Sequence, residues 1–205
     1  MLGTRNSART AAVATAAAAV ALAAFGPSGA SSSGCTSNDG GISSSSCTSG
    51  RYVNPMRGSA WGAGRIDMGV DYWVTRRKAV RAIGRAKIMG SDSHSGWPGG
   101  HYIWYKLLRG DHRGVYIYVA ETMTRLKRAG ARVDAGQRIA IALPRGTGTE
   151  WGFANRHGEP RAAPCYSEGM RTHSGREMNR FLQSLGAPVQ DKLRPGSDQP
   201  TGKRC

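Results

Sequence analysis

The sequence predicts a mainly β protein: a single antiparallel β-sheet domain that ends in one α-helix. Two observations lead to this prediction. Short apolar runs, rich in β-branched and aromatic residues and separated by glycines, are typical of strands, and one segment near the C-terminus has helical periodicity instead. The runs are KAVRAIGRAKIMG, HYIWYKLL, GVYIYVAE, GARVDAGQRIAIAL and TEWGFA, which begin at residues 78, 101, 114, 130 and 149.

Two of these runs form a predicted hairpin. The segment LLRGDHRGVYIY, residues 107–118, carries glycines and an aspartate between two apolar runs, as a connecting loop does. Because successive side chains of a strand point to opposite faces, Tyr102 and Trp104 should share one face, and Ile103 and Tyr105 the other. Part of the aromatic set therefore belongs to the core.

The predicted helix lies in THSGREMNRFLQSLGAP, residues 172–188. Ser174 and Glu177 have the spacing of a capping box, and Gly186 with Pro188 supplies a stop signal. The apolar side chains of this segment fall on one helical face, which indicates packing against the core. They are Met178, Phe181, Leu182 and Leu185.

The N-terminus has the layout of a secretory signal. Arg5 and Arg9 precede an apolar run over residues 11–25, which is short for the ~20 residues that span a bilayer. We therefore predict a signal peptide over residues 1–30 and a secreted, cell-wall-associated protein. The alternative is a lipoprotein anchored through Cys35.

Composition divides the rest of the chain. Residues 31–50 are mostly Ser and Gly, which predicts a flexible linker. The strand-forming runs and the helix lie within a predicted domain over residues 51–188, followed by a basic tail over residues 189–205.

Export makes disulfides the expected use of the four cysteines, since oxidising compartments preserve them. No C-x-x-C spacing occurs, which argues against a zinc ribbon or a thioredoxin-like site. Proximity favours one pair at each end of the chain, and the other connectivities remain open. The cysteines are Cys35, Cys47, Cys165 and Cys205.

The chain is strongly basic: 29 Lys and Arg against 13 Asp and Glu give a net charge of +16 at pH 7. Such a charge favours polyanionic partners. For a secreted protein these are anionic cell-wall polymers. Nucleic-acid binding is the alternative from another class, but no reading helix or RNP-like motif accompanies the basic residues. We expect a monomer, without a membrane span once the signal is removed.

Four fragments in order resemble the M23 (lysostaphin-like, LytM) family of peptidoglycan endopeptidases. DMGVDY, from Asp67, stands where the family has H-x-G-x-D, and AVRAI, from Ala79, follows as its apolar strand. RAGARVDAGQRIAIAL, from Arg128, is similar to the family's V-x-x-G-x-x-V-x-x-G-Q-x-I. TGTEWGF, residues 147–153, stands where the family has T-G-x-H-L-H-F. The resemblance covers roughly residues 64–154 and implies an M23-like architecture.

The same comparison implies that the family's zinc-site histidines are replaced. Asp67 stands at the first histidine, and Asp71 keeps the aspartate ligand. Glu150 and Gly152 stand at the closing H-x-H pair, and the family's Y-x-H motif falls at YVAE, near Glu121. Zinc catalysis needs nitrogen or sulfur ligands and an open position for water, so the resemblance implies a site of another kind.

Several interpretations of these acids remain open. As an enzyme, the chain would be a peptidoglycan hydrolase with Asp71 and Glu150 as the acid/base pair and Asp67 and Glu121 tuning them, since crowded carboxyls raise one another's pKa. As a metal site, Asp67, Asp71 and Glu150 would hold a divalent cation other than zinc, because all-oxygen ligands suit calcium, magnesium or manganese.

Two further interpretations involve no catalysis. The acids could form a binding cleft that grips an ammonium group of a stem peptide. Alternatively, the aspartates could form ordinary surface salt bridges with Arg65, Arg76 or Lys78. Neither interpretation needs a metal.

Aromatic side chains are candidates for stacking on sugars. Trp97 lies in a Gly/Pro loop, Trp151 lies inside the altered closing motif, and Tyr72 follows Asp71. We therefore predict Trp97, Trp151 and Tyr72 as substrate-binding residues. The histidines lack metal-ligand spacing and are expected in exposed loops. They are His94, His101, His112, His157 and His173.

Together these features predict a secreted M23-like domain that acts on or binds peptidoglycan through an acidic cleft in place of the zinc site. The alternative is a non-catalytic module that binds the wall or regulates a hydrolase. The sequence leaves open whether the domain is catalytic.

Overall fold

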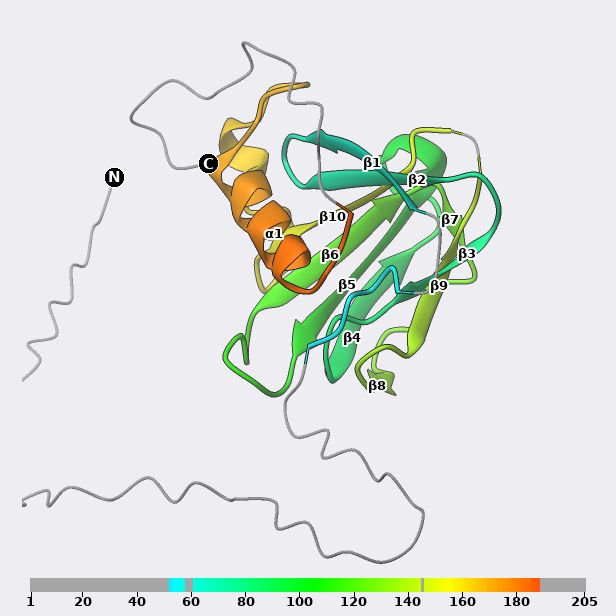
Figure 1. Ribbon diagram of the computed structural model, residues 1–205. Helices are drawn as coiled ribbons and strands as arrows, with labels where there is room; N and C mark the ends of the chain where they lie inside the picture. The colour runs from blue at the N-terminus through cyan, green and yellow to red at the C-terminus, as the bar shows by residue number, and fades with distance from the viewer. Residues whose placement is uncertain (1–51, 58–60, 145, 189–205) are drawn as a thin grey trace, which may run out of the picture. The chain divides into compact units, whose positions relative to one another are not determined.

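The fold is described by a computed structural model that covers residues 52–57, 61–144 and 146–188 (Figure 1). The predicted signal peptide, the linker over residues 31–50 and the basic tail over residues 189–205 lie outside these ranges, as do Cys35, Cys47 and Cys205. Within the described part of the chain, no helix is long and apolar enough to cross a membrane.

Ten strands, two short 3-10 turns and one α-helix make up the described residues. The first five strands are β1 (Trp61–Ile66), β2 (Val70–Val74), β3 (Lys78–Arg81), β4 (Ala86–Asp92) and β5 (His101–Leu107). The others are β6 (Tyr116–Glu121), β7 (Met123–Thr124), β8 (Arg132–Val133), β9 (Arg138–Ala142) and β10 (Thr149–Ala154). The turns are η1 (Pro98–Gly100) and η2 (Ala163–Cys165), and the helix is α1 (His173–Ser184).

The strands form two antiparallel sheets. The larger has seven strands in the order β1-β2-β10-β6-β5-β4-β8, and the smaller has three in the order β3-β9-β7. The prediction of a mainly antiparallel β protein with one C-terminal helix is confirmed. The predicted hairpin is also confirmed, since β5 and β6 pair from His101 opposite Glu121 to Lys106 opposite Tyr116.

One face of the seven-stranded sheet carries the main hydrophobic core. Alternation along β5 sends Ile103 and Tyr105 into this core, where α1 and the buried side chains of the smaller sheet also pack. Tyr102 and Trp104 point the other way, into a separate aromatic cluster with Tyr118. We call this second side of the seven-stranded sheet the open face. The alternation predicted from the sequence is therefore confirmed.

The helix packs on β10, β2 and β1 through the predicted apolar stripe, with Met178 and Leu182 fully buried (Figure 1). Its cap differs from the prediction. Thr172, not Ser174, is the N-cap: its hydroxyl accepts a hydrogen bond from the amide of Gly175 at 2.9 Å. The predicted stop is present at Gly186, whose φ of 83° a residue with a side chain rarely adopts.

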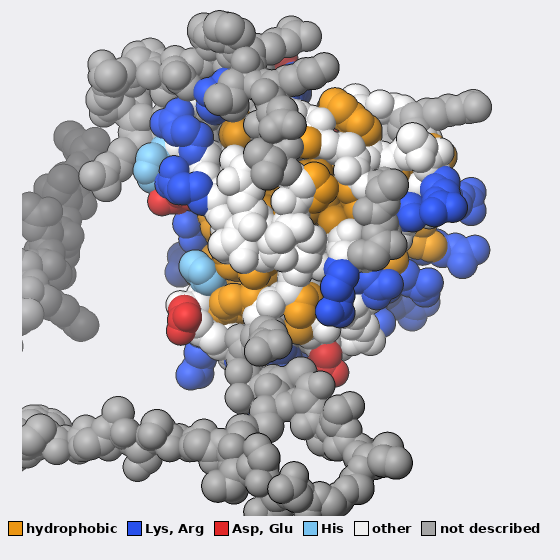
Figure 2. Space-filling model, viewed as in Figure 1, with side chains coloured by type: hydrophobic (Ala, Val, Ile, Leu, Met, Phe, Trp, Pro, Cys, Tyr) orange, Lys and Arg blue, Asp and Glu red, His pale blue; other side chains and the backbone are white. Residues whose placement is uncertain are grey.

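Charge on the surface is uneven. In the view of Figure 2, Lys and Arg side chains gather in patches toward the edges of the molecule, and acidic side chains are few and isolated. Most acids described below are buried, so the surface is more basic than the composition alone suggests.

Candidate functional site

The tight turn between β1 and β2 fixes Asp67. Its amide donates to the carbonyl of Gly69 at 3.1 Å, and its carboxylate accepts from the amide of Gly69 at 3.3 Å. Its own carbonyl accepts from both the amide and the hydroxyl of Thr172, at 3.0 and 2.8 Å. The residue that caps α1 therefore also holds the turn that carries Asp67.

Sheet register brings the other acids to Asp67. Glu150 on β10 lies directly opposite Asp71 on β2, and on its other side lies opposite Ala120 on β6. Glu121 follows at the end of β6 with a φ of 84°, a left-handed conformation that is costly outside glycine and often marks functional positions. Residues far apart in the sequence thus meet because β10 pairs between β2 and β6.

Three of the four predicted acids converge. Carboxylate oxygens of Asp67, Asp71 and Glu150 all lie within 4.8 Å of one another. Glu121 stands beside this group and adds to its negative potential. All four are buried, with exposed fractions of 1% for Asp67, 5% for Asp71, 3% for Glu121 and 2% for Glu150. We call these four residues the carboxylate cluster.

Arg65 supplies the cation of the cluster. Its Nε lies 2.8 Å from Asp67 Oδ2 and 2.9 Å from Asp71 Oδ2, and a terminal nitrogen lies 2.7 Å from Glu168 Oε1. Tyr166 adds a hydrogen bond from its hydroxyl to Asp67 Oδ2 at 3.2 Å. The pairing of the aspartates with Arg65 was one of the open alternatives, but the carboxylates are buried and not on the surface.

Burial is the main cause of the electrostatics of the cluster. It raises the pKa of Asp71 to about 8, with Asp67 and Glu121 raising it further and Arg65 opposing the shift. Burial likewise raises the pKa of Glu150 well above its ordinary value, and Asp67 and Asp71 add to the shift. The pKa values of Asp67 and Glu121 are raised for the same first reason. Asp71 therefore favours its protonated form near neutral pH, and the pKa of Glu150 is shifted in the same direction.

The residues at this place do not fit a zinc ion. By the motif resemblance Gly152 stands at the closing histidine, and a Cβ built on it would collide with the ring of Tyr118. The Tyr118 hydroxyl donates to Glu150 Oε1. A tyrosine ring thus fills the space that a histidine would need at this position, while the guanidinium of Arg65 lies against both aspartates. Zinc sites take most of their ligands from histidine and cysteine, with carboxylates as a minority, and catalytic sites keep an open position.

Two of the three predicted substrate-binding aromatics are in the core. Tyr72 and Trp151 are both 0% exposed and pack edge to face, with ring centroids 5.6 Å apart. The prediction that they stack on a ligand is not consistent with this burial, since they alternate with residues of the open face. Trp97 is half-buried on the open face, and Trp73, next to Tyr72, is 53% exposed.

The histidines occupy varied positions. His101 opens β5 directly opposite Glu121 and is half-buried, and His173 is the first residue of α1. The expectation of exposed loop residues is therefore wrong for both. His94 and His157 are exposed, as expected.

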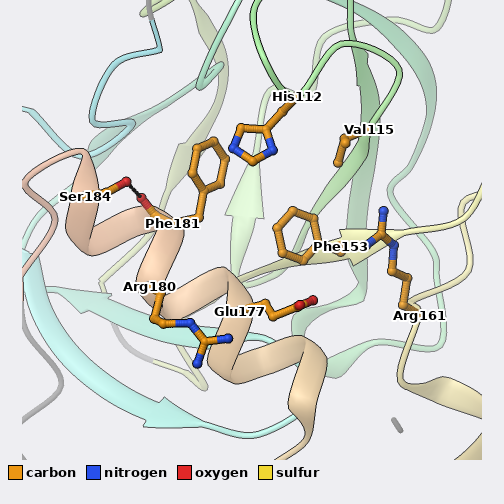
Figure 3. A pocket seen from close by; sticks show the side chains of 8 residues that line it. All are labelled: His112, Val115, Phe153, Arg161, Glu177, Arg180, Phe181 and Ser184. Carbon is orange, nitrogen blue, oxygen red and sulfur yellow. Dashed lines mark hydrogen bonds between the residues drawn. The ribbon is translucent and has the colours of Figure 1, made fainter.

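A groove between α1 and the loop that joins β5 to β6 was not foreseen from the sequence (Figure 3). Its floor is aromatic: the rings of Phe153 and Phe181 stack at 6.3 Å, and His112 lies 4.5 Å from Phe181. The guanidinium of Arg161 lies over Phe153. The groove lies apart from the carboxylate cluster, on the side of the sheet where α1 packs.

The motif resemblance indicated all four acids, and Arg65 was among the expected salt-bridge partners, but the tyrosines beside them were missed. Arg65 stands two residues before Asp67, a spacing that carried a signal for the ion pair. Tyr118 and Tyr166 reach the cluster only through the pairing of β6 with β10 and the path of the chain after β10, and neither had a sequence signal.

The solved structures that resemble this chain include bacterial peptidases. A solution structure of lysostaphin shares 20% identity over 76% of this chain and 60% of its own, with a TM-score of 0.43. Lysostaphin from Staphylococcus simulans, described as an antimicrobial peptidase, shares 21% identity over 69% of this chain and 55% of its own, with a TM-score of 0.40. A zinc-containing peptidase from Vibrio cholerae shares 20% identity over 54% of this chain and 39% of its own, with a TM-score of 0.38.

These structural matches cover only part of each neighbour. The chain spans 60% or less of the length of each of these structures. No family model and no curated protein matches the sequence. The neighbours include the kind of peptidase that the motifs of residues 64–154 resemble, and at these identities and TM-scores they do not assign a reaction to this chain.

Proposed function

We propose that this chain is a cell-wall-associated, M23-like domain that binds peptidoglycan without cleaving it. The observation that carries the proposal is the position of Arg65, whose guanidinium lies within 2.9 Å of both Asp67 and Asp71. A protein cation occupies the electrostatic role that a metal ion would have between these carboxylates. The cluster then acts as a buried support for the open face.

Burial supports a role without catalysis. A general acid or base must come within hydrogen-bond reach of the bond that it helps to break. The side chain of Glu150 is packed beneath Tyr118 and Gly69: a Cβ on Gly69 would meet Glu150 Oε1 at 2.5 Å. Asp71 lies against Gly64 of β1, where an added Cβ would meet the Asp71 Cβ at 2.7 Å. Without movement of the β1–β2 turn, a substrate does not reach the Glu150 carboxyl, and little of the Asp71 side chain is exposed.

Two tryptophans on the open face supply the binding surface in this proposal. Trp73 on β2 lies on the same side of the sheet as Asp71, and its indole lies over Gly62 of β1. Trp97 packs against Tyr102 and Tyr118, with ring centroids 5.7 and 5.4 Å away. Exposed indole faces suit the C–H faces of sugars and the apolar parts of stem peptides. Trp97 was a predicted substrate-binding residue, and Trp73 takes the place of Tyr72 and Trp151.

Location and partners follow from the same proposal. The predicted signal peptide would deliver the domain to the wall, where peptidoglycan and anionic wall polymers are its partners, and it would act as a monomer. Regulation of a separate hydrolase is a role that a non-catalytic binder of this kind could fill.

Co-sedimentation with purified peptidoglycan tests binding. We expect Trp73→Ala and Trp97→Ala each to weaken binding on the order of 3- to 10-fold, because a lost aromatic contact is worth about 0.5–1.5 kcal/mol. Gln183→Ala, on α1 and away from the open face, is the matched control and should bind as the wild type does. Unchanged binding by both tryptophan variants would contradict the proposed surface.

Incubation of the protein with peptidoglycan, with and without a chelator, tests catalysis. The raised pKa values of Asp71 and Glu150 favour a carboxylate hydrolase as the second candidate, since they would give one carboxyl a proton to donate. We expect no soluble fragments. Release by the wild type that is lost in Asp71→Asn and Glu150→Gln would overturn the non-catalytic proposal. Sensitivity of that release to the chelator would favour a divalent cation at Asp67, Asp71 and Glu150.

A further inference from the structure

Three basic side chains form a row across the end of the open face remote from the carboxylate cluster. Lys87 on β4 lies directly opposite Arg132 on β8 and, on its other side, directly opposite Lys106 on β5. Side chains that face each other across antiparallel strands have Cβ atoms about 4.5–5.5 Å apart. We call Arg132, Lys87 and Lys106 the basic row.

The basic row points away from the core. Its chain neighbours Ala86, Ile88, Leu107 and Val133 are buried in the main core, so alternation turns the three basic side chains to the open face. The row ends on Tyr116 of β6, which lies opposite Lys106 and has the ammonium of that lysine 5.4 Å from its ring centroid.

Among the described residues, no carboxylate neutralises the row. The ion pair recorded near it joins Arg85 to Asp134 at 3.8 Å and includes none of its members. Like charges directly opposite one another destabilise a sheet. A bound polyanion would replace the repulsion among these cations with attraction, so the row has the charge expected of an anion-binding site.

We propose that the basic row binds the phosphodiester groups of an anionic cell-wall polymer built of sugar or polyol phosphates. Strands lie about 4.7–4.9 Å apart, so the row extends about 10 Å and can contact more than one anionic group of a chain laid across the strands. This inference rests on the proposed function for the location of the protein, and it assigns the anionic wall polymer to a specific surface.

Tyr116, which lies beside the basic row, favours a glycan phosphate over a single-stranded nucleic acid as the ligand. Single-stranded nucleic acids gain much of their affinity from bases that stack on open ring faces. The ring at the end of the row, Tyr116, has one face beneath the ammonium of Lys106. The row therefore offers charge and little stacking surface.

The two ligand sites lie on one face of one sheet. His101, opposite Glu121, and Lys106 are five positions apart along β5, which corresponds to roughly 17 Å at the rise of an extended strand. An anionic polymer attached to peptidoglycan could thus lie on the basic row while the wall itself contacts Trp73 and Trp97.

A binding assay with two wall preparations and a charge-matched control tests the proposal. Sacculi that retain their anionic polymers are compared with sacculi from which acid extraction has removed them, using the full chain. The test variant is Lys87→Gln/Lys106→Gln. The control is Arg76→Gln/Arg77→Gln, which removes the same charge from two exposed residues between β2 and β3.

We expect the test variant to lose at least 10-fold in affinity for the untreated sacculi and the control to lose less than 3-fold. On extracted sacculi the wild type and both variants should bind equally. Equal losses by the two variants would show that net charge alone acts and would overturn the basic row. Failure of the wild type to bind extracted sacculi would instead contradict the proposed function.

Duplex and single-stranded DNA as competitors complete the design. We expect DNA to displace the wild type from untreated sacculi only at concentrations far above those of the free wall polymer. Tighter binding of DNA that the test variant loses would assign the row to nucleic acid and overturn the proposal. Thermal unfolding of both variants shows whether either is misfolded. If only Arg76→Gln/Arg77→Gln has a lowered melting temperature, Arg128→Gln replaces it as the control.

Discussion

The two ends of the open face differ in the sign and the burial of their charged side chains. At the carboxylate cluster, four buried acids lie together, one guanidinium pairs with two of them, and burial raises the pKa of each acid. At the basic row, three cations stand side by side and are only partly covered, with Arg132 exposed. Buried charge must be paired or neutralised by protonation, whereas exposed like charges cost little because water screens them. The carboxylate cluster is therefore held by contacts within the folded protein, whereas the basic row is accessible to a ligand.

Removal of Arg65 should give the largest effect. Arg65→Leu leaves Asp67 buried without its cation and removes the hydrogen bond from Arg65 to Asp71. We expect this to lower the free energy of unfolding by about 2–4 kcal/mol, less than for a fully buried pair because half of the Arg65 side chain is exposed. Urea unfolding at pH 7 measures it. Arg132→Leu is the control from the other end and should change stability by less than about 0.5 kcal/mol. Equal losses of stability in the two variants would contradict the claim that the carboxylate cluster depends on its arginine and the basic row does not.

The pH dependence of stability should show the raised pKa of Asp71. The pKa of this residue rises from 3.8 to about 8 on folding, so between those values the folded state holds a proton that the unfolded state has lost. Stability should therefore fall as pH rises from about 4 to 8. In Asp71→Asn we expect this fall to be smaller by about 1–3 kcal/mol between pH 5 and pH 8. Parallel curves for the wild type and the variant would mean that Asp71 keeps its ordinary pKa.

Neutralising the centre of the basic row should give the smallest effect and the opposite sign. Lys87→Gln removes a lysine that faces a like charge on each side, and we expect a gain of ~0.2–1 kcal/mol at low salt. The gain should disappear in 1 M salt, where the Debye length is about 3 Å. Arg128→Gln, an exposed residue outside the row, should show no gain. A loss of stability in Lys87→Gln at low salt would mean that the row is not repulsive.

Local patterns determined much of this protein. Periodicity predicted the strands from residue 78 onward, the β5–β6 hairpin, the two faces of β5 and the apolar stripe of α1, because alternation and helical spacing are properties of neighbouring residues. The motif resemblance also located Asp67, Asp71, Glu121 and Glu150. These predictions depend on order along the chain, which the sequence contains directly.

The tertiary structure decided what those residues can do. Sheet order placed β10 between β2 and β6, and so brought Glu150 beside Asp71 and under Tyr118. It also buried Trp151 and Tyr72, which the sequence could equally have left on the surface, and aligned Lys87 with Arg132 and Lys106. Burial and cross-strand register depend on contacts between residues far apart in the chain. For that reason the sequence indicated the four acids, and only the fold decided that they are buried and that two of them pair with an arginine.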